Sequence, residues 1–268
     1  MTNQTRMCIY VSSPQSYKDV LDVFMDCKRK NWGNCPYPLV VSTNWNLEYP
    51  DAVIINSGNL NDSWVERSLD ALKKLDYEYV MMLCDDIFIT EEFNNRIIEE
   101  ILDYMDFNKI NYCRMRPLHS KKTISELPYM SYVNQNTPYG INLQCGIFRR
   151  EFLIDLIGDG TKSAWDIEGM LLERAAKADD TPFSDVIACN RNVFSVVHGI
   201  EKGKWYPSAL KQLSKNEIKI ISNRAKISAM EEYKKNIISF VVERLSPSTR
   251  TTIKHLAQKL GCRFVNQN

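Results

Sequence analysis

Short apolar runs alternate with amphipathic segments along the first hundred residues. Runs typical of buried strands cover Met7–Val11, Leu39–Val41, Ala52–Ile55 and Tyr79–Cys84. Between them, apolar residues recur at helical spacing, and candidate helix caps stand at Ser16 (with Asp19), Ser63 (with Glu66) and Thr90. This alternation predicts a mostly parallel sheet with helices on its faces.

The pattern is less regular after residue 109. We expect strands over Ile110–Met115, Tyr139–Phe148 and Val193–Val197, and a long loop over 120–138. We also expect a helix over Trp165–Ala178 that is capped by Ser163. A further helix is opened by Ser214 and Glu217 and ended by Pro247, and a last helix ends at Gly261. The chain then divides into a body over 1–207 and a basic helical C-terminal extension over 208–268.

Charge is distributed unevenly along the chain. Residues 201–268 hold 14 Lys and Arg against 5 Asp and Glu, a net charge of +9, whereas the rest of the chain has a net charge of −8. Two interpretations are open for the extension: contact with an anionic surface, or a solvated helical face.

Composition excludes several classes of protein. With 44% hydrophobic and 25% charged residues, the chain has ordinary globular composition. It contains no run of about 18 apolar residues for a membrane-spanning helix, and its first residues do not resemble a secretory signal. Its eight cysteines form no CxxC motif and several lie in apolar runs, which is typical of a cytosolic protein.

Two adjacent carboxylates follow the fourth apolar run. Ligands of open α/β sheets bind beyond the carboxyl ends of the strands, and Asp85 and Asp86 stand at such an end. Neighbouring buried carboxylates are costly unless a charge neutralises them, and Mg²⁺ or Mn²⁺ with nucleotide phosphates would do so. The alternative is that one Asp caps a turn and the other is solvated.

Two further segments carry candidate chemistry. Asp166 and Glu168 follow Trp165 in the first turns of a predicted helix. They suggest a general base beside an aromatic platform, or acids that favour a helix N-terminus. His198 ends the last predicted strand, and neutral imidazole is a common metal ligand, although a lone histidine at a strand end is more often structural. Lys204 follows Gly203 and could meet phosphate charge.

In this order, the features resemble the nucleotide-sugar glycosyltransferases of the GT-A fold, and more closely bacterial capsule and O-antigen transferases. The similarity extends over about residues 6–206 and includes Cys35–Val40, Asp62–Trp64, Ala71–Leu75, Gln144–Arg149 and Gly203–Trp205. It implies an α/β, Rossmann-like GT-A fold with a mostly parallel central sheet and a catalytic domain over 1–207.

The resemblance also implies roles for single residues. The metal ion, Mn²⁺ or Mg²⁺, would be held by Asp86, Asp85 and His198. The donor nucleotide would be contacted by Ser12, Arg67, Asp85 and Lys204. The catalytic base of an inverting reaction would be Glu168 or Asp166, and the acceptor would be contacted by Trp165 and Gln144. Cys84 departs from the family's DxD motif, because it takes the place of the first Asp if Asp86 is the second. Whether the anomeric centre is inverted or retained stays open.

The implied activity is a metal-dependent hexosyltransferase. It would move a sugar from a nucleotide-sugar donor, with a UDP-sugar favoured, to a hydroxyl of a saccharide or lipid-linked saccharide in bacterial surface polysaccharide synthesis. We expect a cytoplasmic enzyme whose extension contacts the anionic inner face of the membrane as a peripheral protein.

Three alternatives belong to other classes. A sugar nucleotidyltransferase usually has a glycine-rich loop after its first strand, and Ser12–Gln15 has no glycine. A scaffold that has lost catalysis stays open because of Cys84. Thr252–Gly261 resembles the first half of a helix-turn-helix, but only seven residues follow it, so we expect no nucleic-acid partner.

Overall fold

One sheet organises the molecule. The structure is a computed structural model that describes residues 5–59, 62–118 and 122–234. Eight strands form the sheet in the order β3-β2-β1-β4-β8-β6-β9-β7. Their bounds are β1 Met7–Ser12, β2 Leu39–Thr43, β3 Val53–Asn56, β4 Tyr79–Cys84, β6 Tyr112–Arg114, β7 Met130–Asn134, β8 Cys145–Arg149 and β9 Pro182–Cys189.

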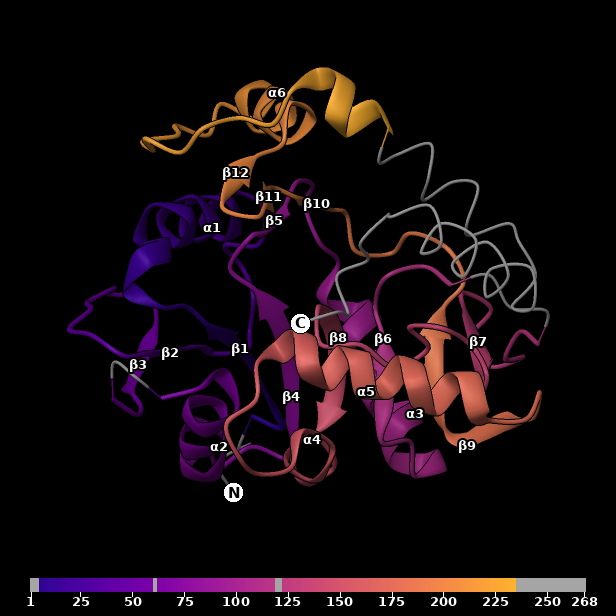
Figure 1. Cartoon of the computed structure of the whole chain (residues 1–268). Coiled ribbons are helices and arrows are strands. Elements are labelled where there is room, and N and C mark those ends of the chain that lie inside the picture. Colours follow the sequence, from indigo (N-terminus) through magenta and orange to yellow (C-terminus); the bar gives the residue numbers. More distant parts are fainter. Residues whose placement is uncertain (1–4, 60–61, 119–121, 235–268) are drawn as a thin grey trace, which may run out of the picture.

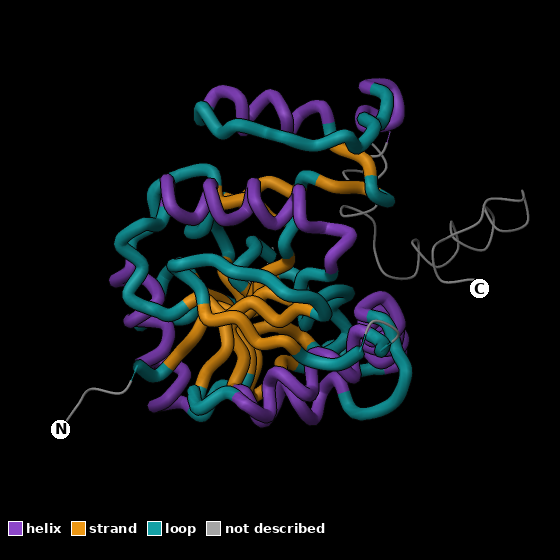
Figure 2. Tube along the Cα trace, turned by 90° about the vertical axis from the view of Figure 1, so that its left-hand side faces the viewer, coloured by secondary structure: helices purple, strands orange, loops and turns teal. Residues whose placement is uncertain are grey.

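The sheet is mostly parallel. β3, β2, β1 and β4 pair in parallel, as do β6 and β9. β8 is antiparallel to both β4 and β6, and β7 is antiparallel to β9. Figure 2 shows the twisted strands with helices around them. The expected fold class, a Rossmann-like α/β fold with a mostly parallel sheet flanked by helices, is confirmed.

Alternation along the strands supplies a core on each face of the sheet. Met7 and Ile9 of β1 pack with α1 (Lys18–Asn31) and α3 (Asn95–Asn108). Cys8 and Tyr10 face the other side, in the apolar cluster to which α2, α4 and α5 contribute. These helices cover Trp64–Lys74, Arg150–Ile157 and Ala164–Lys177. Side chains of a strand point alternately to opposite faces, so β1 is buried on both.

A smaller layer lies beyond the carboxyl end of β4. β5 (Ile87–Ile89) pairs antiparallel with β10 (Val196–His198), and β11 (Ile200–Glu201) forms a hairpin with β12 (Lys204–Trp205). Helix α6 (Pro207–Lys215) lies above α1 in Figure 1. Trp205 stacks on Phe88 of β5 with ring centroids 5.6 Å apart, and this contact joins the hairpin to the body.

Two of the predicted helix caps are confirmed and two are wrong. Ser63 and Ser163 make complete capping boxes at the starts of α2 and α5. Ser16 makes none: η1, a 3₁₀ turn over Gln15–Tyr17, precedes α1, and the Asp19 carboxylate is bound by Arg224. The Thr90 hydroxyl donates to a carbonyl across the β5–β10 pair, and Asn94 caps α3 instead.

Two expectations for the longer segments are also wrong. The polar stretch 120–138 contains β7, an edge strand. No helix begins at Ser214, which lies inside α6; Asn216 ends that helix, and Glu217 follows in the left-handed region with φ +53°. Residues 229–234 are helical. The rest of the helix expected to end at Pro247 and the one expected to end at Gly261 lie outside the described residues.

Over the residues that the structure describes, no helix has the length and apolar character needed to cross a membrane.

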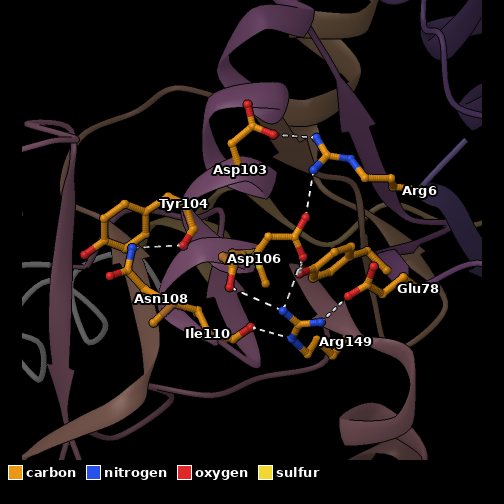
Figure 3. Close-up of polar contacts among 10 residues, drawn as sticks. Arg6, Glu78, Asp103, Tyr104, Asp106, Asn108, Ile110 and Arg149 are labelled. Atoms are coloured by element: carbon orange, nitrogen blue, oxygen red, sulfur yellow. Dashed lines mark hydrogen bonds and ion pairs between the residues drawn. The ribbon is translucent and has the colours of Figure 1, made fainter. Parts of the chain in front are cut away.

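An ion-pair network fixes the end of the sheet opposite to β5 and β10 (Figure 3). The Asp106 carboxylate of α3 accepts hydrogen bonds from the buried Tyr79 hydroxyl at 2.6 Å and from Arg6 at 2.8 Å. Arg149, which is paired with Glu78, approaches it at 3.3 Å. Burial raises the pKa of Asp106, but the hydrogen bonds from Tyr79 and Arg6 outweigh it and leave the pKa below 3.8.

Replacing Asp106 with Ala is expected to lower the free energy of unfolding by about 1–3 kcal/mol, because it leaves the buried Tyr79 hydroxyl without an acceptor. Asp103→Ala, which removes a more exposed pair with Arg6, should cost at most about 1 kcal/mol. Urea denaturation measures both. Since the folded-state pKa of Asp106 is lowered, its contribution is full above pH 3.8 and is lost as pH falls through the folded-state pKa. Equal losses in the two variants would contradict this account.

Candidate functional site

One cavity of about 350 Å³ opens at the carboxyl ends of β1 and β4, between α2 and α5. Eight of the ten residues that the sequence singled out line it: Ser12, Arg67, Asp85, Asp86, Gln144, Trp165, Glu168 and His198. Asp166 and Lys204 do not line this cavity. The topology therefore gathers residues that are up to 186 positions apart in the sequence.

Asp85 and Asp86 form the turn between β4 and β5. Asp85 is 7% exposed, and the Ser13 hydroxyl donates to its Oδ2 at 2.6 Å. Burial, with a further contribution from the neighbouring Asp86, raises the pKa of Asp85 to about 7 against the opposing hydrogen bond from Ser13. The two carboxylates are held in different places, because Asp86 points to another partner.

That partner is His198. Antiparallel pairing sets His198 of β10 opposite Ile87 of β5, next to Asp86. Asp86 Oδ2 and His198 Nε2 lie 3.0 Å apart, and the Gly199 amide donates to the Asp86 carbonyl at 2.8 Å. Gly199 packs against the Phe88 ring so closely that an added Cβ would lie 2.0 Å from it. A glycine is therefore needed here to keep His198 beside Asp86.

The donor atoms of Asp86 and His198 suit a divalent cation of nucleotide chemistry. Mg²⁺ is usually held by one or two carboxylates together with substrate phosphates and water, and imidazole is a frequent ligand of transition metals. Within the described residues, no group of three or more His, Cys, Asp or Glu side chains is arranged to hold a metal. The residues present fit a cation whose remaining ligands come from phosphate and water.

Glu168 and Asp166 have different surroundings. Glu168 is 7% exposed, lines the cavity and accepts from the Leu143 amide at 3.3 Å. Burial raises the pKa of Glu168, although the Leu143 hydrogen bond and the charge of Arg114 oppose it. Asp166 is exposed and accepts from the amide and hydroxyl of Ser163, which lower its pKa. Asp166 Oδ2 thus serves the helix cap.

Three more predicted residues line the cavity, and a fourth, Lys204, lies outside it. Trp165 is 67% exposed at the cavity, and Gln144 accepts from Arg116 Nη1 at 3.0 Å. Arg67 reaches the cavity from α2 and donates to the Asp62 carbonyl. Lys204 is exposed on the β11–β12 hairpin.

Sequence reasoning missed three arginines near the cavity. The Arg224 guanidinium lies 4.3 Å from the ring centre of Tyr17, a cavity residue, and is held by Asp19. Nothing in the sequence around Arg224 indicated this, since the segment reads as part of a helix. Arg114 and Arg116, at the end of β6, were the better signal: two cations at the end of a predicted strand.

Comparisons with known proteins give matches to solved structures alone. No protein-family model matches this chain, and no curated protein matches it either. S. aureus TarS 1–349 in complex with UDP-GlcNAc is similar at 11% identity and a TM-score of 0.42, over 69% of this chain and 58% of that one. The mannosyltransferase PcManGT from Pyrobaculum calidifontis, in complex with GDP-Man and Mn²⁺, is similar at 12% identity and a TM-score of 0.46, over 75% and 59%.

A third structure, a CMP:2-keto-3-deoxy-manno-octonic acid synthetase complexed with CTP, is similar at 12% identity and a TM-score of 0.45, over 80% of this chain and 98% of that one. The structures found thus include glycosyltransferases and a sugar nucleotidyltransferase. The chain spans less than two thirds of the TarS and PcManGT structures. Similarity of this size carries no conclusion about activity, which depends on the site's own geometry.

Proposed function

We propose that this chain is a metal-assisted glycosyltransferase. It transfers a sugar from a nucleotide-sugar donor, with a UDP-sugar favoured, to a hydroxyl of a saccharide or lipid-linked saccharide acceptor in bacterial surface polysaccharide synthesis. The observation that supports it is the meeting of Asp86 and His198 at 3.0 Å in the same cavity as the buried Glu168. This arrangement combines a phosphate-side cation site with a base.

The donor half of the cavity lies around β1, α2 and the Asp85–Asp86 turn. Ser12 ends β1, where open α/β sheets bind nucleotides. Arg67 places positive charge on the same side. Asp86 and His198 would hold Mn²⁺ or Mg²⁺, whose chemistry there is to neutralise the negative charge on the leaving diphosphate. The contact of Lys204 with the diphosphate stays a prediction. Lys204 lies in β12, and the strand that pairs with it, β11, follows His198 in the chain.

The acceptor half lies around α5. Glu168 takes the proton of the attacking hydroxyl, and the raised pKa makes its carboxylate a stronger base than an exposed glutamate. Trp165 offers an exposed aromatic face for a sugar ring, and Gln144 a polar contact held by Arg116. This assignment favours Glu168 over Asp166, because Asp166 Oδ2 is engaged in the capping box and Asp166 does not line the cavity.

Thermal stability against a panel of nucleotides tests the proposal. A ligand at 100 times its Kd stabilises the folded state by about 2.7 kcal/mol, which raises Tm by roughly 5–10 °C in a domain of this size. We expect such a shift with one nucleoside diphosphate, UDP first, in Mn²⁺ and a smaller one in EDTA.

Other outcomes of the panel identify the alternatives. A shift confined to a nucleoside triphosphate, with pyrophosphate released in the presence of a sugar phosphate, indicates a nucleotidyltransferase. The absence of a shift with every nucleotide contradicts the transferase and leaves the scaffold.

The basic extension provides a separate prediction. Each well-placed Lys or Arg contributes about 1 kcal/mol at an anionic membrane surface, and we expect the full chain to sediment with phosphatidylglycerol-rich vesicles at low salt. Binding should be lost at high salt and with neutral phosphatidylcholine vesicles. Equal sedimentation with both kinds of vesicle would contradict electrostatic attachment.

A further inference from the structure

Two neighbouring arginines lie beside the acceptor half of the cavity, and no described carboxylate forms an ion pair with either of them. Arg114 is the last residue of β6, and Arg116 follows two positions later. Both are half-buried. Within the part of the chain that the structure describes, neither forms an ion pair with Asp or Glu. Arg149 and Arg224, at similar burial, are each paired with carboxylates.

The two side chains are held in place by neutral groups. Arg114 Nε donates to the Arg116 carbonyl at 3.1 Å, and Arg114 Nη1 donates to the Tyr139 carbonyl. Arg116 Nη1 donates to Gln144 Oε1 at 3.0 Å. These bonds orient the guanidinium groups, but they use only part of the five N–H donors that each one carries. Arg114 Nη2 and Arg116 Nη2 make none of these contacts.

The β6 register places Arg114 on the same face of the sheet as Glu168. Tyr112 packs on Phe148 in the same apolar cluster as Ile167 of α5. Side chains two positions apart in a strand point to the same face, so Arg114 faces the side on which α5 packs. Opposite Arg114 in the ladder stands Gly146, whose lack of a side chain makes room for the Tyr112 ring, 2.5 Å from where a Cβ would lie.

Placing two cations together here is unfavourable in the absence of a ligand. Burial lowers the pKa of Arg114 and the charge of Arg116 lowers it further, although the charge of Glu168 opposes them. Half-buried charges are normally paired, and here one carboxylate, Glu168, faces two cations without forming an ion pair with either. The positive charge that remains indicates that a further anion completes the arrangement. The planar guanidinium fork matches phosphate and carboxylate groups, to which it donates two parallel hydrogen bonds.

We propose that Arg114 and Arg116 bind an oxyanion carried by the acceptor, so that the acceptor is an anionic saccharide. The inference rests on the proposed function, since Glu168 and Gln144 define the acceptor half. The oxyanion has two possible sources: the phosphate of a phosphorylated or phosphate-linked saccharide, and the carboxylate of an acidic sugar. An anion held here lies beside the base, where it positions the acceptor hydroxyl.

Calorimetric titration tests the proposal on the full chain with Mn²⁺ and saturating UDP, so that phosphate binding at the donor side is blocked. The probes are glucose 6-phosphate, glucuronate and neutral glucose. We expect one of the two anions to bind at least about 10-fold more tightly than glucose, and which one identifies the source. The double variant R114Q/R116Q should lose that preference, while R96Q, on the exposed part of α3, should retain it.

Two further measurements separate the causes of a negative result. The affinity for UDP is measured in every variant; unchanged UDP binding with loss of anion preference supports the proposal and shows that the variant is folded. R114K/R116K keeps both charges and is expected to retain part of the preference. Equal binding of all three probes to the wild type, or a preference that survives R114Q/R116Q, overturns the oxyanion site. If UDP fails to bind but the Arg-dependent anion preference is present, the glycosyltransferase proposal fails and the oxyanion site stands.

Discussion

Replacing Glu168 with Gln is expected to lower kcat by about 10²- to 10⁴-fold, the usual contribution of a general base. Gln keeps the shape of the side chain and its carbonyl can still accept from the Leu143 amide. It cannot take a proton from the acceptor hydroxyl. The steady-state rate of sugar transfer measures the loss, and the KM for the donor should change little because Glu168 lies on the acceptor side.

The pH dependence distinguishes a base from a structural acid. Only the carboxylate form accepts a proton, so activity falls as pH drops through the pKa of Glu168. Because burial raises that pKa above the ordinary 4.5, the acid limb of the wild-type kcat/KM profile is expected above pH 4.5. The limb should be absent from the residual activity of Glu168→Gln.

In Glu168→Gln, the expected change in stability is opposite in direction to the expected change in activity. A buried carboxyl group whose folded-state pKa is raised binds its proton more tightly in the folded state, so it destabilises the protein as pH rises above the unfolded pKa. Glu168→Gln should therefore be at least as stable as the wild type at pH 7, as measured by Tm. The control is Asp166→Asn, which weakens the α5 cap while leaving the cavity intact. A 10²-fold loss of kcat in the control, or none in Glu168→Gln, would contradict the assignment.

The difference between these two acids shows where sequence reasoning reached its limit. Both stand in the first turns of α5, and helix dipole arguments apply to both. The spacing of Ser163 and Asp166 is that of a capping box, a signal that identifies Asp166 as structural. The burial of Glu168 depends on the Leu143 segment that packs over it, which is 25 positions away and has no sequence marker.

The strands β1, β2 and β4 could be predicted because they are buried on both faces. Such strands read as continuous apolar runs, and the run Tyr79–Cys84 ends directly at the acidic turn. The strand β7 was missed because it is an edge strand with polar residues such as Ser131 and Asn134. β9 was missed because it begins with Pro182, and a proline in a sequence argues against a strand. In the structure Pro182 stands at the first position of β9, where proline is tolerated.

The contact between Asp86 and His198 could be expected only through the family resemblance. The residues are 112 positions apart, and they meet because β5 and β10 pair outside the main sheet. A three-residue strand such as β5 has no periodicity that could be distinguished from a loop. The same holds for Arg224, which meets Asp19 across 205 positions.

Replacing Asp86 with Asn is expected to abolish the part of nucleotide binding that depends on Mn²⁺. Asn keeps the size of the side chain and can still hydrogen bond to His198, so the β5–β10 pair should persist. It removes the negative charge that attracts a cation. In the thermal panel, the wild type should give a larger shift with UDP in Mn²⁺ than in EDTA, whereas Asp86→Asn should give the same shift in both.

Catalysis by Asp86→Asn should fall by at least about 10²-fold, since the loss of one preorganised group at a developing charge costs about that much. His198→Gln should act on the same step. If both side chains hold one cation, their effects are not additive, and the double variant should be only slightly worse than Asp86→Asn alone. Independent sites would instead give the product of the two losses.

A matched control is Asp70→Asn on the exposed part of α2, where the carboxylate pairs with Lys74. It changes the net charge by the same amount as Asp86→Asn but at a site away from the cavity. If the two Asn variants lose the Mn²⁺-dependent shift equally, the effect is one of overall charge, and the cation site at Asp86 and His198 is wrong. If Asp70→Asn behaves as the wild type and Asp86→Asn does not, the cation binds where β4 ends.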